Sequence, residues 1–184
     1  MRSSSARNAT PVPRDLGSRV REAALLEGDF VLSSGERSSF YVDKYLFSTE
    51  PGLLRDLANA LSETLPDDLE RLAGIELGAV PLVVATALAT GLPYAIVRKS
   101  AKEHGSSAGR DIEGNLEPGE RVALIEDVVT TGTQAMRAAQ ILARSGAEIV
   151  TIVAVLDRRE RAEALLGRFP FRALLRMEDL RVGR

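Results

Sequence analysis

Residues 121–134 constrain the fold of this 184-residue chain more than any other stretch. The apolar run 122–125 indicates a buried parallel strand, and the acidic pair Glu126 and Asp127 follows it directly. A turn rich in threonine and glycine comes next. Small apolar residues then recur at helical spacing: Ala135, Ala138, Ala139 and Leu142. The order strand, turn, helix predicts an open α/β sheet, and such sheets bind their ligands at the carboxyl ends of the strands.

The turn after the acidic pair carries groups that suit a phosphate. The start of the following helix offers unpaired backbone N–H groups and the positive end of the helix dipole. The hydroxyls of Thr130, Thr131 and Thr133 add donors, and Gly132 lets the backbone approach an anion closely. Two carboxylates beside this turn would neutralise a cation that accompanies the phosphate or would accept hydrogen bonds from sugar hydroxyls. A sugar phosphate with magnesium satisfies both conditions.

The alternative is an ordinary connection between strand and helix, in which Asp127 or a threonine caps the helix and nothing binds. Two other nucleotide-binding patterns find no support, because the chain contains neither a Gly-Lys-Thr or Gly-Lys-Ser sequence nor a G-x-G-x-x-G pattern. A G-x-S-x-G pattern does occur at residues 105–109. It does not fit a hydrolase nucleophile, since the single histidine precedes the serine and no apolar helix follows.

Two segments carry a resemblance to a known family. Residues 124–133 (LIEDVVTTGT) resemble the phosphoribosyl-pyrophosphate (PRPP) signature of type I phosphoribosyltransferases, and residues 98–105 (RKSAKEHG) resemble the lid loop of the orotate phosphoribosyltransferases. The likeness extends roughly from Leu25 to Arg159. It implies an α/β fold with a central, mostly parallel sheet flanked by helices, a small N-terminal hood and a flexible lid loop.

The resemblance also implies an activity: transfer of the 5-phosphoribosyl group from PRPP to orotate, which gives orotidine 5′-monophosphate and pyrophosphate in pyrimidine biosynthesis. Mg²⁺ would enter bound to PRPP, without direct protein ligands. The active unit would be a homodimer in which each lid serves the neighbouring subunit. Two alternatives stay open, namely a PRPP-binding regulator without catalysis and a phosphoribosyltransferase for another base.

Site residues follow from the same resemblance. The implied catalytic residues are Lys102, His104 and Asp127. Those implied to bind PRPP are Arg98, Lys99, Lys102, His104, Glu126, Asp127, Val128, Val129, Thr130, Thr131, Gly132, Thr133 and Gln134. Those implied to bind orotate are Thr130 and Arg158. Arg158 follows the expected strand 148–156, so topology brings it to the same sheet edge, and a guanidinium suits a planar carboxylate. The alternative for Arg158 is a surface ion pair with Asp157.

Composition limits the other possibilities. The 24 basic and 26 acidic side chains give a net charge of −2, which argues against a nucleic-acid partner. Without cysteine and with one histidine, the chain has no thiolate or multi-histidine metal site. No run is long enough for a membrane span, so we expect a cytoplasmic protein. We expect a disordered tail at residues 1–13 and one domain at 14–184, with the hood at about 14–45 and the lid at about 99–119.

The remaining elements follow from apolar periodicity and from glycine and proline. The expected helices are 14–27 with Gly28 as its stop, 51–65, one from Pro81 to just before Gly91, and a short one at 160–166. The expected strands are 30–32, 40–43, 73–77, 94–98, 148–156 and 171–175. Compared with the resembled family, Ser33 and Ser39 replace a usual lysine and proline in the hood. A lysine that some members carry near Gly78 is missing.

Overall fold

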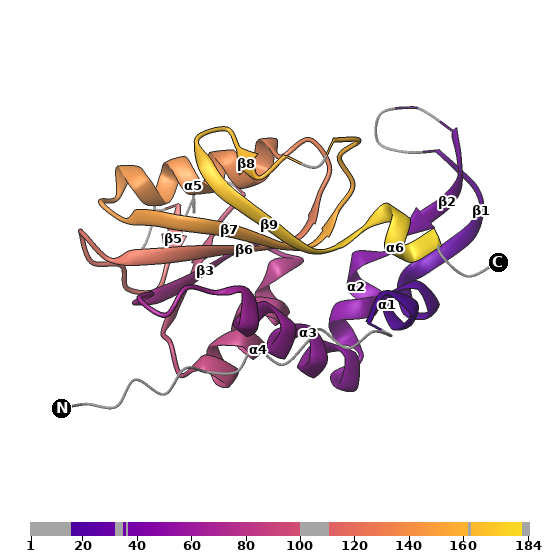
Figure 1. Ribbon diagram of the computed structural model, residues 1–184. Helices are drawn as coiled ribbons and strands as arrows, with labels where there is room; N and C mark the ends of the chain where they lie inside the picture. The colour runs from indigo at the N-terminus through magenta and orange to yellow at the C-terminus, as the bar shows by residue number, and fades with distance from the viewer. Residues whose placement is uncertain (1–15, 32–34, 36, 100–110, 162, 182–184) are drawn as a thin grey trace.

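The computed structural model describes residues 16–31, 35, 37–99, 111–161 and 163–181. Within them, seven strands form one sheet in the order β5-β4-β3-β6-β7-β9-β8, and β1 and β2 form a separate pair (Figure 1). The strands are β1 (Leu25–Val31), β2 (Arg37–Val42), β3 (Arg71–Ile75), β4 (Tyr94–Val97), β5 (Ile112–Glu113), β6 (Arg121–Val129), β7 (Glu148–Asp157), β8 (Leu165–Leu166) and β9 (Phe169–Arg176). The helices are α1 (Leu16–Ala24), α2 (Lys44–Thr49), α3 (Pro51–Thr64), α4 (Ala79–Thr90), α5 (Thr133–Arg144) and α6 (Met177–Arg181).

The central strands of the large sheet are parallel. β3 pairs with β4 and β6, β6 with β7, and β7 with β9, all in parallel, while the short edge strands β5 and β8 pair antiparallel. The carboxyl ends of β3, β6 and β7 therefore share one edge. This arrangement confirms the predicted α/β fold class.

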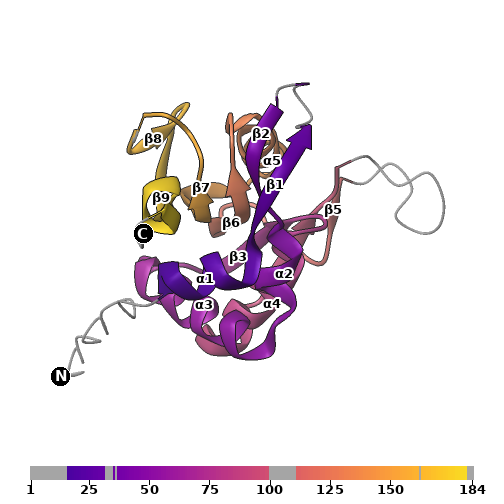
Figure 2. The same cartoon turned by 90° about the vertical axis from the view of Figure 1, so that its right-hand side faces the viewer.

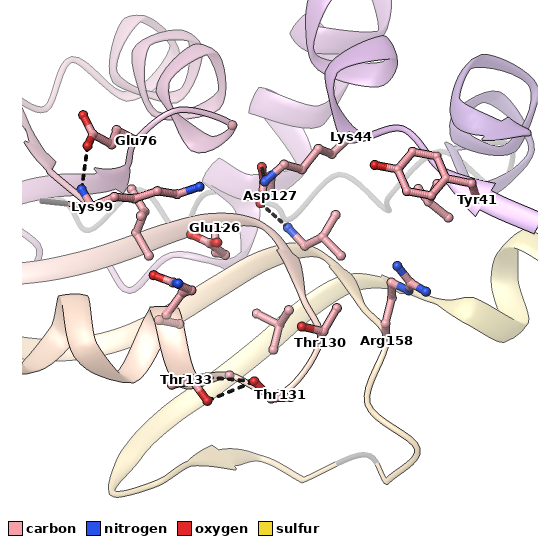
Figure 3. A pocket seen from close by; sticks show the side chains of 18 of the residues that line it. Tyr41, Lys44, Glu76, Lys99, Glu126, Asp127, Thr130, Thr131, Thr133 and Arg158 are labelled. Atoms are coloured by element: carbon pink, nitrogen blue, oxygen red, sulfur yellow. Dashed lines mark hydrogen bonds and ion pairs between the residues drawn. The ribbon is translucent and has the colours of Figure 1, made fainter. Parts of the chain in front are cut away.

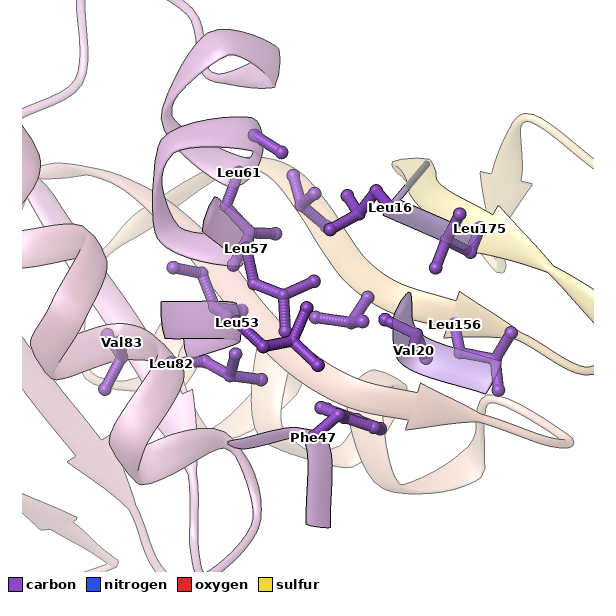
Figure 4. Close-up of a cluster of buried hydrophobic side chains, with 14 of the residues drawn as sticks. Leu16, Val20, Phe47, Leu53, Leu57, Leu61, Leu82, Val83, Leu156 and Leu175 are labelled. Atoms are coloured by element: carbon purple, nitrogen blue, oxygen red, sulfur yellow. The ribbon is translucent and has the colours of Figure 1, made fainter. Parts of the chain in front are cut away.

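Both faces of the sheet are covered, so the inner strands are apolar on both sides. In β6, Ala123 and Ile125 pack into a cluster with α1, α3 and α4, whereas Val122 and Leu124 pack into a second cluster with α5. The alternation arises because successive side chains of a strand point to opposite faces. Figure 4 shows the first cluster, in which Leu57 of α3 lies among side chains of α1 and the sheet.

The β1–β2 pair stands apart from the large sheet (Figure 2), as expected for the hood. The predicted first helix was too long. It ends at Ala24 because Leu25 already pairs with Val42, and Gly28 lies in a bulge of β1 between Glu27 and Phe30 instead of ending the helix. The chain then enters α2, which the sequence did not predict. Its N-cap is Asp43, whose side chain accepts a hydrogen bond from the Tyr45 N–H (3.0 Å).

Two further predictions about elements need correction. The acidic pair lies inside β6 and not after it, because β7 pairs with β6 as far as Val129. The helix expected at 160–166 is wrong, since Leu165 and Leu166 form β8 against β9. The expected helix before Gly91 and the last strand are confirmed by α4 and β9. In the described part of the chain, no helix combines the length and apolar character needed to cross a membrane.

Candidate active site

A cavity of about 700 Å³ opens at the carboxyl end of β6 (Figure 3). It is lined by Val31, Tyr41, Val42, Lys44, Ile75, Glu76, Gly78, Lys99, Glu126, Asp127, Val128, Val129, Thr130, Thr131, Gly132, Thr133, Gln134, Ala135 and Arg158. The cavity thus brings together the acidic pair, the whole predicted phosphate turn, Lys99 and Arg158. β1 and β2 contribute one wall, so the cavity lies between the hood and the sheet.

The acidic pair is buried at the floor of this cavity. Glu126 and Asp127 are 7% and 1% exposed. Asp127 Oδ2 forms an ion pair with Lys44 Nζ (2.9 Å), and its Oδ1 accepts a hydrogen bond from the Val128 N–H (2.6 Å). Glu126 Oε2 has no hydrogen-bond partner among the described residues. Asp127 Oδ2 has no partner among them other than the Lys44 ammonium group. Buried polar atoms left open in this way indicate a place for ligand donors.

Burial and charge shift the titration of these groups. Burial raises the pKa of the Glu126 carboxyl well above its ordinary value, and the charge of Asp127 adds to the rise, whereas Lys44 and Lys99 oppose it. Burial alone would lower the pKa of Lys44. The hydrogen bond and charge of Asp127, with the charge of Glu126, outweigh burial and raise the pKa of Lys44 above its ordinary value. One lysine therefore balances two neighbouring carboxyl groups.

Gly78, the N-cap of α4, allows this close packing. A Cβ at this position would lie 1.6 Å from Asp127 Oδ2 and 3.2 Å from Lys44 Nζ. Any side chain at residue 78 would displace the carboxylate or the ammonium group. The loop after β3 consequently presents its bare backbone to the acidic pair.

The predicted phosphate turn has the expected form. Gly132 adopts a φ of +81° as the N-cap of α5, and a glycine has no side chain with which to cap the helix. Asp127 is paired with Lys44, so the alternative in which it caps α5 is wrong. Thr131 and Thr133 are exposed, with their hydroxyl oxygens 3.0 Å apart, and the Thr133 N–H donates to the Thr131 hydroxyl at 3.3 Å. The turn therefore points hydroxyl and backbone donors into the cavity.

The basic residues from the predicted lid fall into two groups. The Lys99 N–H donates to Glu76 Oε1 (2.6 Å), and its side chain lines the cavity. Arg98 does not line the cavity but contacts Glu113 of β5 (3.5 Å), and its N–H donates to the Asp111 carbonyl (2.8 Å). Lys102 and His104 lie outside the described residues, as do 100–110 of the predicted lid at 99–119 and the tail at 1–13.

The two consecutive arginines after β7 behave differently. Arg159 makes a bidentate pair with the buried Asp157 at 3.0 Å for each contact and stacks on Phe171 at 4.4 Å. Arg158 instead lines the cavity, positioned by its N–H donating to the Val129 carbonyl (2.8 Å). The alternative pairing of Arg158 with Asp157 is wrong, because Arg159 is the partner of that carboxylate.

Three polar residues of the cavity were missed by the sequence reasoning: Tyr41, Lys44 and Glu76. Lys44 could have been suspected, because two carboxyl groups predicted at the end of a buried strand need a nearby cation. Nothing in the sequence points to Lys44 in particular as that cation.

Among the residues that the structure describes, no group of three or more His, Cys, Asp or Glu side chains forms a metal cluster. Asp127 is already engaged by Lys44, and Glu126 Oε2 is the open carboxylate oxygen. Mg²⁺ prefers six oxygen ligands and keeps several waters, so these residues fit an ion that is held mainly by the phosphates of a substrate.

The parallel sheet, the phosphate turn and the buried acidic pair together define a phosphoribosyl-transferring protein. In agreement, residues 52–167 match the model of the phosphoribosyl transferase domain family. The orotate phosphoribosyltransferase of Natronomonas pharaonis is 44% identical over 155 residues, covering 84% of this chain and 87% of the relative.

Solved structures agree with this relationship. The Mycobacterium tuberculosis orotate phosphoribosyltransferase in complex with Fe(III) dicitrate is 34% identical with a TM-score of 0.80, covering 92% of this chain and 99% of that one. The same enzyme in complex with PRPP is 28% identical with a TM-score of 0.76, covering 94% and 100%. The chain therefore belongs to the orotate phosphoribosyltransferase family, which confirms the resemblance seen in the sequence.

Proposed function

We propose that the cavity at the end of β6 transfers the 5-phosphoribosyl group from PRPP to N1 of orotate, releasing pyrophosphate and forming orotidine 5′-monophosphate. The observation that carries this proposal is the meeting of three groups in one cavity: the turn 130–134, the buried acidic pair and Arg158. They match the phosphate, the ribose and the carboxylate-bearing base of the two substrates.

PRPP is held by the acidic pair and the turn. The 5′-phosphate accepts hydrogen bonds from residues 130–134 at the start of α5. The ribose hydroxyls donate to the open Oε2 of Glu126 and to Asp127, whose oxygens can accept further hydrogen bonds besides those from Lys44 and the Val128 N–H. Because these carboxylates are buried, their contacts with the ribose are strong and well oriented.

The base is held beside the turn, by residues at the ends of β6 and β7. Arg158 forms a bidentate pair with the carboxylate of orotate, and Thr130 adds a hydroxyl contact. Tyr41 and Val31 of the hood cover the same side of the cavity, where an aromatic and an apolar side chain suit a planar ring.

Transfer proceeds through a sugar with oxocarbenium character, and negative charge grows on the departing pyrophosphate. Lys99, with Lys102 and His104 of the lid, stabilises that charge more in the transition state than in the ground state. Bound to PRPP, Mg²⁺ neutralises part of the pyrophosphate charge. The closed lid excludes water, which would otherwise compete with orotate.

The acting unit in this proposal is a homodimer in the cytoplasm, in which the lid of one subunit serves the site of its partner. The absence of cysteine from the whole sequence is compatible with a reducing compartment.

Refolding a mixture of Lys102→Ala and Asp127→Asn tests the shared site, since a mixed dimer regains one intact site only if the lid acts in trans. About a quarter of wild-type activity should then return.

The test of the reaction is the loss of orotate absorbance after PRPP and Mg²⁺ are added to the purified protein, with other bases run beside orotate. Consumption of orotate only when PRPP and Mg²⁺ are both present supports the proposal. A folded sample that binds PRPP and turns over no base would favour a regulator, and turnover of another base alone would change the substrate.

A further inference from the structure

We propose that Lys44, at the start of α2, is a PRPP-positioning residue that keeps Asp127 ready for the ribose and supplies the positive charge that the loop after β3 lacks. This inference rests on the function proposed above. It concerns a residue outside both segments that carry the family resemblance.

The position of Lys44 follows from the junction between hood and core. The Asp43 N–H donates to the Ala24 carbonyl (2.8 Å), which ties the end of β2 to the end of α1. α2 begins at the next residue, so the Lys44 side chain leaves a fixed backbone. Its ammonium group lies 5.7 Å from the centre of the Tyr45 ring and reaches Asp127 at 2.9 Å (Figure 3).

The surroundings show what the charge from α2 contributes. The loop after β3 consists of Glu76, Leu77 and Gly78 and has no basic side chain. Lys44 Nζ lies 3.2 Å from the point where a Cβ of residue 78 would be, so it fills the space next to the bare backbone of that loop. A group bound between the loop and the acidic pair is therefore within reach of Lys44.

An ammonium group has three donors, and the described residues give Lys44 one carboxylate contact. The remaining donors are available to an oxygen of the bound substrate. The side chain of Lys44 is 31% exposed, so a ligand can reach it, whereas that of Asp127 is 1% exposed. Lys44 can hold Asp127 and contact PRPP at the same time.

Charge balance gives Lys44 its effect on binding. Glu126 and Asp127 are adjacent and buried, and two such carboxyl groups without a cation in contact would take up a proton. A proton on the Glu126 carboxyl, whose pKa burial raises and the charge of Lys44 lowers, would remove acceptor capacity toward the ribose hydroxyls. PRPP also brings several negative charges toward these groups, and Lys44 offsets that repulsion.

The test uses Lys44→Met, which keeps an unbranched side chain one atom shorter and removes its charge, with Lys44→Arg and Lys44→Gln as companions. Arg37→Met is the matched control, because Arg37 pairs with Asp29 on the exposed hood and does not line the cavity. PRPP affinity is measured by calorimetry, together with kcat/KM for each substrate and the melting temperature. Lys44→Met should bind PRPP about tenfold or more weakly, Lys44→Arg should recover part of the loss, and Arg37→Met should match wild type.

The pH profile separates positioning from a structural role. Loss of Lys44 removes a charge that lowers the pKa of Glu126, so the acidic limb of kcat/KM for PRPP should move to higher pH in Lys44→Met. Among the described residues, the charged and titratable groups around the pair are Tyr41 of β2, Lys44 and Tyr45 of α2, Glu76 after β3, Lys99 after β4, and Arg158 after β7. Apart from residue 44, all of these groups are the same in wild type and in Lys44→Met.

A double-mutant cycle shows whether Lys44 acts through Asp127. In the Asp127→Asn background, Lys44→Met should cost much less PRPP affinity than it does alone. Three results would overturn the inference: losses of PRPP affinity that are fully additive in the double mutant, a pH profile of kcat/KM that does not move in Lys44→Met, or a folded Lys44→Met protein with unchanged PRPP affinity. If wild type binds PRPP but does not consume orotate, the proposed reaction fails, while the calorimetric comparison still decides the role of Lys44.

Discussion

Strand β6 has an ion pair at each end, and the two pairs are built differently. At the amino end, Arg71 of β3 holds Glu120 through two contacts (2.7 and 2.8 Å), and the Glu117 N–H donates to the same carboxylate at 2.9 Å. At the carboxyl end, Lys44 makes one contact with Asp127 while the neighbouring Glu126 keeps an open oxygen.

The comparison separates stability from function. The Arg71–Glu120 pair is satisfied within the protein, as a structural pair must be when its side chains are mostly buried. The Lys44–Asp127 pair also joins two elements of the fold, but the neighbouring Glu126 Oε2 keeps unused hydrogen-bonding capacity. Incomplete satisfaction of buried carboxylates lowers stability, and a substrate that supplies the missing donors recovers it.

The largest effect is expected from Gly78→Ala, which acts at the incomplete end. The added Cβ would lie 1.6 Å from Asp127 Oδ2, so the carboxylate must move. A displacement of this size should lower kcat/KM by about a hundredfold. The matched control is Gly91→Ala at the other end of α4, where φ is +75° and nothing lies within 4 Å. That control should lose ~1 kcal/mol of stability and no activity. Equal activity in the two variants would remove Gly78 from the site.

Arg158 and Arg159, after β7, show the same contrast between a ligand contact and a structural contact, with smaller expected effects. Arg158→Ala should raise the KM for orotate about tenfold and leave the KM for PRPP and the melting temperature nearly unchanged, because it removes a ligand contact. Arg159→Ala should instead lower the melting temperature, since it leaves the buried Asp157 without its bidentate partner. Steady-state kinetics and thermal unfolding of both variants check this. A rise of both KM values by the same factor in Arg158→Ala would assign it a structural role.

These contrasts also show what the sequence could predict. β6, its turn and α5 are contiguous, so apolar periodicity and turn residues sufficed to predict this strand, turn and helix. Lys44 was missed because its contact with Asp127 depends on how the hood joins the core, which no local pattern encodes. The wrong helix at 160–166 has a similar cause. Arg159 donates to the Glu163 and Leu165 carbonyls, and β8 pairs with β9; these contacts override the helical pattern of the segment.

The smallest effect is a pH dependence of stability with opposite signs at the two ends of β6. The Arg71 hydrogen bond lowers the pKa of Glu120, so its contribution is present above the ordinary value of 4.5 and is lost as pH falls through the folded pKa. Burial raises the pKa of Glu126, so its contribution is present below 4.5 and is lost as pH rises through the folded pKa.

Glu126→Gln should therefore melt at the same temperature as wild type near pH 4 and at a higher temperature than wild type as pH rises toward 8. Thermal unfolding followed across this range measures the difference. A gap that stays constant with pH would mean that Glu126 is not held with a raised pKa.

The central claim is that the carboxyl end of β6 is reserved for PRPP while the amino end serves the fold. The most direct test compares Asp127→Asn with Glu120→Gln, two isosteric changes on either side of one strand, by kcat/KM for PRPP and by melting temperature. Asp127→Asn should lose at least about tenfold in kcat/KM, or ~1.4 kcal/mol of transition-state stabilisation, with little change in melting temperature. Glu120→Gln should lose about 1–3 kcal/mol of stability and keep its kcat/KM. An Asp127→Asn protein with unchanged kcat/KM, or two variants that lose stability and activity alike, would contradict the account.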